Sequence, residues 1–265
     1  MPAMAVLQAA GAVNAVEENL HRLKGYAARA AEQGAELLVT PELFATGYAP
    51  ALVVDSDGEG IRAELADIAR RHRIALVGST VEAAGEGRHI TASLFDRQGA
   101  ELTRYRKSHL FGPEEKSVFT PGNDLPDPVP LLGLTVALGI CYDIEFPEFA
   151  RSAARRGVDL LCIPTAVPTT GDVGGRPPEL TYNAERISTL LVPARALENG
   201  LYVAYANHTS PDFTGFSSIA SPYGTFLGLA GGGEELLVAE VDRSEVERAR
   251  GLNTYLTCMR PALYG

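Results

Sequence analysis

The sequence predicts an α/β fold built on mixed β-sheets, and three observations support this prediction. Short apolar runs alternate with amphipathic helical stretches, which favours strand–helix–strand units. A turn signal at Asp96-Arg97-Gln98-Gly99 separates two strand-like segments and indicates an antiparallel hairpin. The 265 residues, 46% hydrophobic and 21% charged, are enough to bury a large core. We therefore expect one domain over residues 1–265, with two sheets and about four packing helices.

The N-terminal part predicts two strands around an amphipathic helix. Residues 4–9 form the first apolar strand, and Asn14, with an acidic residue three positions later, is typical of a capped helix start. Apolar residues at helical spacing follow until a glycine ends the pattern. Residues 37–39 form the second strand, which a Thr-Pro pair interrupts. Glu42 is therefore expected just beyond the carboxyl end of that strand.

The next part predicts one helix and three strands. Periodic apolar residues predict a helix from about residue 59 to residue 72, and residues 74–79 form the strand that follows it. Residues 90–95 and Glu101–Arg106 flank the hairpin turn. Lys107 therefore follows the last of these strands directly.

The C-terminal half repeats the alternation. Residues 132–140 are uncharged and mostly apolar, which predicts a buried strand that ends at Cys141. The remaining expected elements are a helix over residues 147–156, a strand over 159–163, a polar loop over 165–178, a helix over roughly 180–199, and strands over 201–206, 217–220, 225–229 and 235–241.

Composition disfavours several classes of function. The net charge of −10 and the lack of a basic stripe disfavour a nucleic-acid partner. No apolar run approaches the ~18 residues that a membrane span needs, and the N-terminus lacks the pattern of a signal peptide. Three cysteines without a CxxC spacing fit a reducing compartment, so we expect a cytoplasmic protein without a membrane partner. No metal site is expected, because the five histidines form no zinc-like pair (His21, His72, His89, His109 and His208).

Three motifs each carry a reactive side chain at or just beyond the end of a predicted strand. They are Thr40-Pro41-Glu42-Leu43-Phe44, Tyr105-Arg106-Lys107-Ser108-His109-Leu110-Phe111 and Gly139-Ile140-Cys141-Tyr142-Asp143. Each has an ordinary reading as well: Glu42 as a solvated loop acid, Lys107 as an exposed cation and Cys141 as a packed thiol. Together, a carboxylate, an ammonium and a thiol are sufficient for acyl transfer. A lysine nearby would also lower the pKa of the thiol.

In their order and local sequences, these motifs resemble the nitrilase superfamily of carbon–nitrogen hydrolases. The resemblance covers essentially the whole chain, and it includes Phe119-Thr120-Pro121-Gly122 and Pro222-Tyr223-Gly224. It implies a four-layer α/β/β/α sandwich with two mixed sheets, no cofactor, and pairing of subunits into a homodimer or a larger homo-oligomer.

The resemblance also implies roles for individual residues. Cys141 would be the nucleophile, Glu42 the general base and Lys107 the stabiliser of the oxyanion, with the backbone N–H of Tyr142 as a second oxyanion donor. Glu115 matches a further active-site glutamate of the family, and its neighbour Glu114 stays an alternative. The substrate-binding candidates are Tyr142, His109 and Thr165, the last at the start of a loop that would wall the pocket.

The expected activity is hydrolysis of a small carboxamide to the acid and ammonia through a thioester on Cys141. Many true nitrilases have Trp-Glu after the cysteine, whereas this chain has Tyr142-Asp143, as in the amidase branches. Three alternatives stay open: a nitrilase with the same triad, a Cys/His/Asn hydrolase that uses Cys141 with Asn207 and His208, and a binding protein without catalysis.

Overall fold

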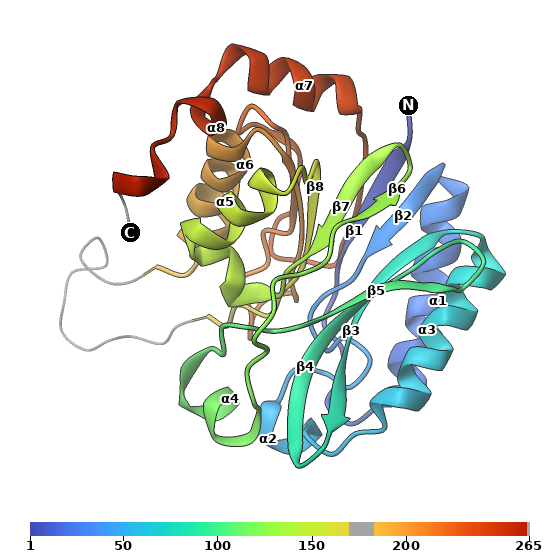
Figure 1. The fold of residues 1–265 in the computed structure, drawn as a ribbon. Coiled ribbons are helices and arrows are strands. Elements are labelled where there is room, and N and C mark those ends of the chain that lie inside the picture. The colour runs from blue at the N-terminus through green and yellow to red at the C-terminus, as the bar shows by residue number, and fades with distance from the viewer. Residues whose placement is uncertain (170–182, 264–265) are drawn as a thin grey trace.

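Two six-stranded β-sheets pack face to face between outer layers of helices in the computed structural model, which describes residues 1–169 and 183–263 (Figure 1). The strand order is β12-β1-β2-β3-β4-β5 in the first sheet and β11-β10-β9-β8-β7-β6 in the second. Both sheets are mixed. The predicted four-layer α/β/β/α sandwich is therefore confirmed.

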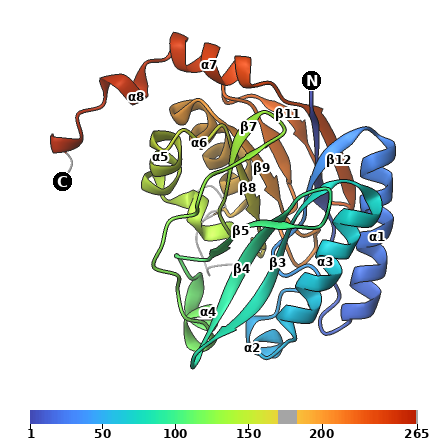
Figure 2. The same ribbon diagram turned by 45° about the vertical axis from the view of Figure 1, so that its right-hand side comes forward.

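The first sheet combines a parallel centre with antiparallel flanks. Its strands are β1 (Ala3–Gln8), β2 (Ala35–Val39), β3 (Ala75–Ala84), β4 (Gly87–Phe95), β5 (Glu101–Arg106) and β12 (Glu235–Glu240). Strands β1, β2 and β3 are parallel, whereas β4 is antiparallel to both β3 and β5. Strands β2, β3 and β5 consequently end at the same edge. Helices α1 (Val16–Glu32) and α3 (Gly58–His72) cover the outer face (Figure 2).

The second sheet has the same plan. Its strands are β6 (Val129–Leu131), β7 (Leu134–Leu138), β8 (Leu160–Pro164), β9 (Tyr202–Ala206), β10 (Ser218–Ala220) and β11 (Phe226–Leu229). Strands β7, β8 and β9 are parallel, and α5 (Pro147–Arg155) and α6 (Val192–Asn199) lie outside them. The backbone N–H of Glu42 donates to the Thr165 carbonyl at 3.2 Å, which joins the chain after β2 to the chain after β8. The carboxyl ends of both sheets thus meet.

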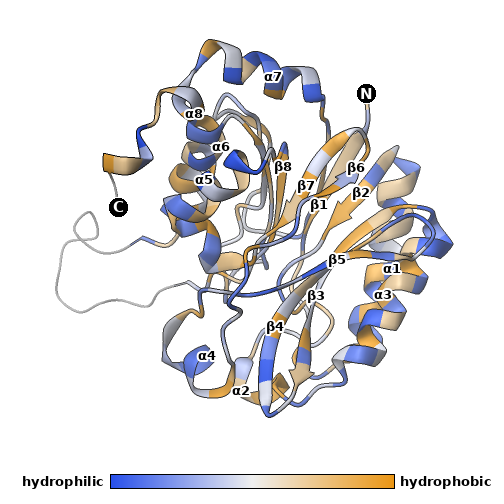
Figure 3. Cartoon of the chain, viewed as in Figure 1, coloured by the Kyte–Doolittle hydropathy of each residue, from blue (hydrophilic) through white to orange (hydrophobic). Residues whose placement is uncertain are grey.

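Burial follows the layers. The central strands of both sheets carry mostly hydrophobic residues, and polar residues gather on the outward faces of the helices (Figure 3). One apolar cluster fills the sandwich and includes Val6, Val77 and Val136. A second lies between the first sheet and its helices and includes Leu23, Leu38 and Ile68. Since apolar burial drives folding, these two clusters are what fix the sheets against each other and against the helices.

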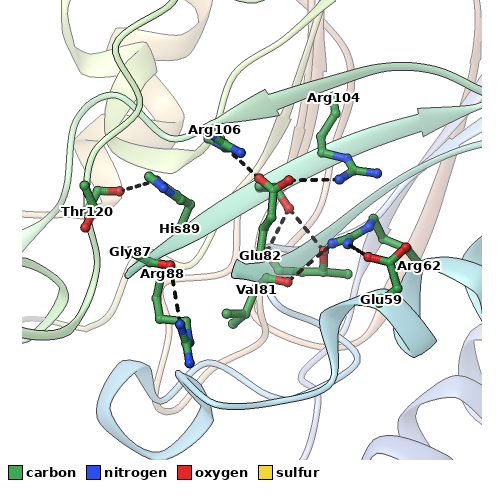
Figure 4. A network of polar contacts seen from close by, with 12 residues as sticks. Glu59, Arg62, Val81, Glu82, Gly87, Arg88, His89, Arg104, Arg106 and Thr120 are labelled. Carbon is green, nitrogen blue, oxygen red and sulfur yellow. Dashed lines mark hydrogen bonds and ion pairs between the residues drawn. The ribbon is translucent and has the colours of Figure 1, made fainter. Parts of the chain in front are cut away.

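Polar contacts pin the hairpin that leads to Lys107. The Glu82 carboxylate of β3 accepts from Arg104 at 2.9 Å and from Arg106 at 2.6 Å, both on β5 (Figure 4). Arg62 of α3 donates to the Thr80 hydroxyl at 3.1 Å. These contacts tie β5 to β3 and tie α3 to the same strand, so the end of β5 is held in place.

Most predicted elements are present, but some boundaries were wrong. The strand predicted over residues 132–140 is shorter and corresponds to β7 (Leu134–Leu138). The first two of the predicted residues form the turn of a hairpin with β6, and Leu132 has a φ of +54° in the left-handed region. Asn14 is not the cap of α1. It has a φ of +58°, the N-cap position is Ala15, and no side chain of the described residues caps this end of the helix. The first residues of the helix predicted over roughly 180–199 lie outside the described residues. Within the described residues, a π-helical turn, Ile187–Leu191, precedes α6.

Several short elements were not predicted. They are helices α2 (Pro50–Val53), α4 (Gly112–Val118), α7 (Arg243–Leu252) and α8 (Tyr255–Cys258), and the 3₁₀ turns Cys141–Glu145 and Pro261–Leu263. The polar loop expected over residues 165–178 extends beyond residue 169 and so lies partly outside the described residues. Within residues 1–169 and 183–263, no helix combines the length and the apolar character needed to cross a membrane.

Candidate active site

Cys141 lies on a tightly held turn three residues beyond the end of β7. It begins the 3₁₀ turn Cys141–Glu145 and has a φ of +47°, a conformation that costs a non-glycine residue roughly 1–3 kcal/mol. The Asp143 carboxylate holds the turn, since it accepts the backbone N–H of Ile140 at 2.9 Å and the Tyr105 hydroxyl at 3.0 Å. Only 4% of Cys141 is exposed. The thiol is thus fixed in a buried position at the meeting edge of the sheets.

Lys107 lies between two carboxylates. It follows β5, and its Nζ donates to Glu42 Oε1 at 2.8 Å and to Glu115 Oε1 at 2.7 Å. All three side chains are at most 1% exposed. An ammonium group has three N–H donors, so one remains for a further acceptor.

Glu42 is held through its backbone as well as through its carboxylate. Its N–H donates to the Thr165 carbonyl, and its own carbonyl accepts from His208 Nε2 at 2.7 Å. The next residue, Leu43, has a φ of +51°. Among the described residues, Glu42 Oε2 has no hydrogen-bond partner although it is buried. One carboxylate oxygen is therefore bound to Lys107 and the other is available to take a proton.

Of the two adjacent glutamates on α4, it is Glu115 that contacts Lys107. Its Oε1 also accepts from the Tyr48 hydroxyl at 2.6 Å, and its Oε2 accepts from the backbone N–H of Phe111 at 2.7 Å. Glu114 is exposed and accepts a long hydrogen bond of 3.3 Å from the backbone N–H of Ala51. The structure therefore brings Glu115 into the cluster and leaves Glu114 outside.

Burial controls the electrostatics of the cluster. It raises the pKa of Glu42 to about 7, while the Lys107 ammonium acts to lower this pKa and the Glu115 charge adds to the rise. Burial also raises the pKa of the Cys141 thiol well above its usual value; the charge of Glu42 adds to this, and Lys107 acts in the opposite direction. The expectation that Lys107 would give a thiol of lowered pKa was therefore wrong. At neutral pH Cys141 rests as the thiol and needs a base.

The ammonium stays charged in this site. Burial acts to lower the pKa of Lys107, but the charges of Glu42 and Glu115 help to raise it above its usual value. A permanent cation beside a neutral thiol is arranged to stabilise negative charge that develops on a bound molecule.

The predicted substrate-binding residues lie around this cluster. Tyr142 is half-buried and makes edge contacts with Phe111 and Phe146, at ring-centroid distances of 5.4 and 5.0 Å. His109 stacks on Phe146 at 3.9 Å, and its Nδ1 contacts the Asp143 carboxylate at 2.7 Å. The Thr165 hydroxyl is buried and donates to the Ile163 carbonyl at 3.0 Å.

Asn207 and His208, the partners of Cys141 in the Cys/His/Asn alternative, are hydrogen-bonded to backbone groups. Asn207 accepts the backbone N–H groups of Val167 and His208 and donates to the Gly215 carbonyl, so its amide supports loops. The His208 ring donates to the backbone of Glu42, and no hydrogen bond with Cys141 is present among the described residues. The two other thiols lie elsewhere: Cys162 is buried in β8 and Cys258 is exposed.

Sequence reasoning missed several residues that hold the site. Tyr48 gives no sequence signal, because a tyrosine in a loop has no characteristic pattern. For Asp143, two residues after Cys141, the sequence favours a cap of the helix that begins at Pro147 over a supporting role in the site. In the structure Asp143 has the supporting role, as the acceptor that joins Tyr105, His109 and the cysteine turn. Within the described ranges, no group of three or more His, Cys, Asp or Glu side chains could hold a metal ion.

Comparisons with known proteins converge on one family. The family model described as carbon-nitrogen hydrolase matches residues 3–251. A protein of Pseudomonas protegens described as a hydrolase in the pqqF 5′ region is 38% identical, over 94% of this chain and 86% of its own length. The omega-amidase NIT2 of Mus musculus is 31% identical over 93% of this chain and 91% of its own, and the 2-oxoglutaramate amidase of Bacillus subtilis is 32% identical over 87% of each.

Solved structures give the same result. The amidase from Nesterenkonia sp. AN1 matches with a TM-score of 0.87 and 38% identity, covering 100% of this chain and 98% of the other. A structure of a mutant of that amidase, with a TM-score of 0.87, 37% identity and the same coverage, shows the result of Michael addition of acrylamide at the active-site cysteine.

Proposed function

The chain belongs to the carbon–nitrogen hydrolase family within the nitrilase superfamily, and on this premise we propose that it is an amidase that converts a small carboxamide to the carboxylic acid and ammonia. As a family member it is a hydrolase of carbon–nitrogen bonds. The observation that carries the proposal is the Oε2 of buried Glu42, which has no hydrogen-bond partner in residues 1–169 and 183–263 and lies in a cluster with the Cys141 thiol and the Lys107 ammonium.

In the first half of the reaction, Glu42 accepts the Cys141 proton and the sulfur attacks the carbonyl carbon of the amide. The negative charge moves to the carbonyl oxygen. The third N–H of Lys107 and the backbone N–H of Tyr142 stabilise it, because Tyr142 lies in the first turn of a 3₁₀ helix, where N–H groups have no partner within the helix. The C–N bond then breaks, the nitrogen takes the proton held by Glu42, and ammonia leaves.

In the second half, water hydrolyses the thioester. Glu42, ionised again, takes a proton from water as the water oxygen attacks the acyl carbon, and the C–S bond breaks when the tetrahedral intermediate collapses. The sulfur recovers its proton and the acid is released. Glu115 keeps Lys107 in place throughout, since it accepts from the ammonium, from Tyr48 and from a backbone N–H.

Amide substrates are favoured over nitriles by two observations. The relatives from mouse and Bacillus subtilis and the structural neighbour from Nesterenkonia are described as amidases. Tyr142-Asp143 also replaces the Trp-Glu pattern of many nitrilases, and Asp143 has a defined task here as the acceptor that holds the cysteine turn.

Ammonia release tests this proposal. Purified protein is given short aliphatic and aromatic carboxamides, each paired with its nitrile at equal concentration. We expect faster ammonia release from the amides, and none above background from Cys141→Ala. Faster hydrolysis of nitriles across several pairs would overturn the amidase assignment, and undiminished activity in Cys141→Ala would overturn the nucleophile.

A further inference from the structure

His208 is fully buried at the end of β9, and it reaches across to the chain after β2. Its Nε2 lies 2.7 Å from the Glu42 carbonyl oxygen. A carbonyl can only accept a hydrogen bond, so Nε2 carries the proton and Nδ1 does not. Within the described part of the chain Nδ1 has no partner. The ring is therefore committed to one tautomer and to one hydrogen bond.

The ring is also fixed from the side. It packs against Phe213 with ring centroids 4.6 Å apart, and Phe213 contacts Tyr48 at 5.9 Å. The Tyr48 hydroxyl donates to Glu115, which binds Lys107. Burial lowers the pKa of His208 to about 4, so the ring stays neutral near neutral pH. His208 thus belongs to a chain of contacts that connects Glu42 to Lys107 through Phe213, Tyr48 and Glu115.

We propose that His208 is a positioning residue for Glu42: by donating to the backbone carbonyl of Glu42, it holds the carboxylate in the direction in which Oε2 takes the Cys141 proton. This rests on the proposed function, in which Glu42 is the base. The Glu42 backbone is held at its N–H by Thr165 and at its carbonyl by His208. The turn needs such restraints, because Leu43 occupies the left-handed region directly after it.

Two substitutions separate the hydrogen bond from the bulk of the ring. His208→Phe keeps an aromatic ring against Phe213 but has no donor, and it leaves the buried Glu42 carbonyl without a partner. We expect kcat for an amide to fall by roughly 10- to 100-fold while KM changes by less than about threefold. His208→Gln supplies an amide N–H at similar reach and should restore kcat to within about fivefold of wild type.

A second readout does not depend on the substrate. Iodoacetamide alkylation of Cys141, followed by site-resolved mass spectrometry, reports how readily Glu42 removes the thiol proton. We expect His208→Phe to slow this alkylation at neutral pH, as Glu42→Gln does, and His208→Gln to leave it near the wild-type rate. In a Glu42→Gln background, His208→Phe should cause no further loss, because it acts through Glu42.

His89 provides a matched control. It lies on β4 and is also buried, and its Nδ1 donates to the Thr120 carbonyl at 2.8 Å (Figure 4). His89→Phe removes a comparable hydrogen bond and should lower thermal stability without slowing the alkylation of Cys141. Equal slowing by both variants would make the effect a general loss of stability and would overturn the proposal. If His208→Phe does not fold, His208→Leu takes its place as the variant without a donor. A His208→Gln variant that is as impaired as Glu42→Gln would also contradict the positioning role of His208.

These experiments separate the positioning role of His208 from the proposed amidase activity. If the wild type hydrolyses no amide but alkylation still depends on Glu42 and on the His208 donor, the positioning role stands and the amidase assignment fails. If amides are hydrolysed but His208→Phe has wild-type kcat and alkylation rate, the positioning role fails alone.

Discussion

Glu42, the proposed base, has to ionise in a buried environment that disfavours its charged form. Burial raises the pKa of Glu42 to about 7, and only the ionised carboxylate can accept the Cys141 proton. Activity should therefore be lost as the pH falls through about 7, with kcat/KM declining about tenfold for each further pH unit. A pH profile of ammonia release from 5 to 9 measures this limb.

Glu145 is the matched control for that profile. Burial raises its pKa to about 7 as well, while Arg195 and Lys107 act to lower it. Glu145→Gln should keep the acid limb, whereas Glu42→Gln should remove it together with most of the activity. If the limb disappears in Glu145→Gln and persists in Glu42→Gln, the base has been assigned to the wrong residue.

Glu42 and Lys107 should act as one unit. The 2.8 Å contact between them means that removing Lys107 leaves buried Glu42 without its charge partner, and removing Glu42 leaves buried Lys107 with Glu115 as its partner. We expect Glu42→Gln and Lys107→Met each to lower kcat by at least roughly 1,000-fold, and the double variant to lose little more. Steady-state kinetics of the three variants measure this, and losses that multiply would show that the residues serve separate steps.

The adjacent acids Glu114 and Glu115 mark the limit of sequence reasoning at this scale. Their spacing from Lys107 differs by one residue, and only the direction of helix α4 decides which side chain turns inward. Glu115→Gln should lower kcat and the melting temperature, because it weakens contacts with Lys107 and Tyr48, whereas Glu114→Gln should change neither. Equal effects of the two substitutions would contradict the special position of Glu115.

At the scale of elements, the cysteine turn depends on close packing behind it. A Cβ on Gly139 would lie 2.7 Å from Ile163 Cδ1 and 2.7 Å from a ring carbon of Phe149, whereas one on Gly25 of helix α1 would meet nothing within 4 Å. Gly139→Ala should thus lower the free energy of unfolding by about 1–3 kcal/mol. Each kcal/mol should lower the melting temperature by about 2–4 °C. Gly25→Ala should stabilise it by about 0.5–1 kcal/mol. Calorimetry that finds both variants equally stable would contradict this packing.

Elements were predictable where the pattern was long. Helix α3 and strand β5 follow the sequence closely, since 15 residues of apolar periodicity and a clear hairpin turn leave few alternatives. Helices α2 and α4, with four and seven residues, are too short for a periodic signal and form because the surrounding structure supports them. The direction of His208 could not be predicted either, because its partner, the Glu42 carbonyl, is distant in sequence.

For the whole molecule, the association of subunits stays a prediction, as does a single domain over residues 1–265. Some large apolar side chains of the C-terminal half are exposed, among them Leu197 of α6 and Tyr255 of α8, and such residues are often covered in an assembly. Light scattering at micromolar concentration should give a mass near twice 28.2 kDa, or a higher multiple. A mass of one chain would contradict this.

The most direct test of the central claim is interception of the acyl-enzyme by hydroxylamine during amide hydrolysis. A thioester on Cys141 partitions between water and hydroxylamine, so the amide should yield a hydroxamate while ammonia release continues. The hydroxamate share should rise with hydroxylamine concentration, and both products should vanish in Cys141→Ala. Ammonia release with no hydroxamate at any hydroxylamine concentration would mean that water attacks the amide directly, and it would contradict a thioester on Cys141.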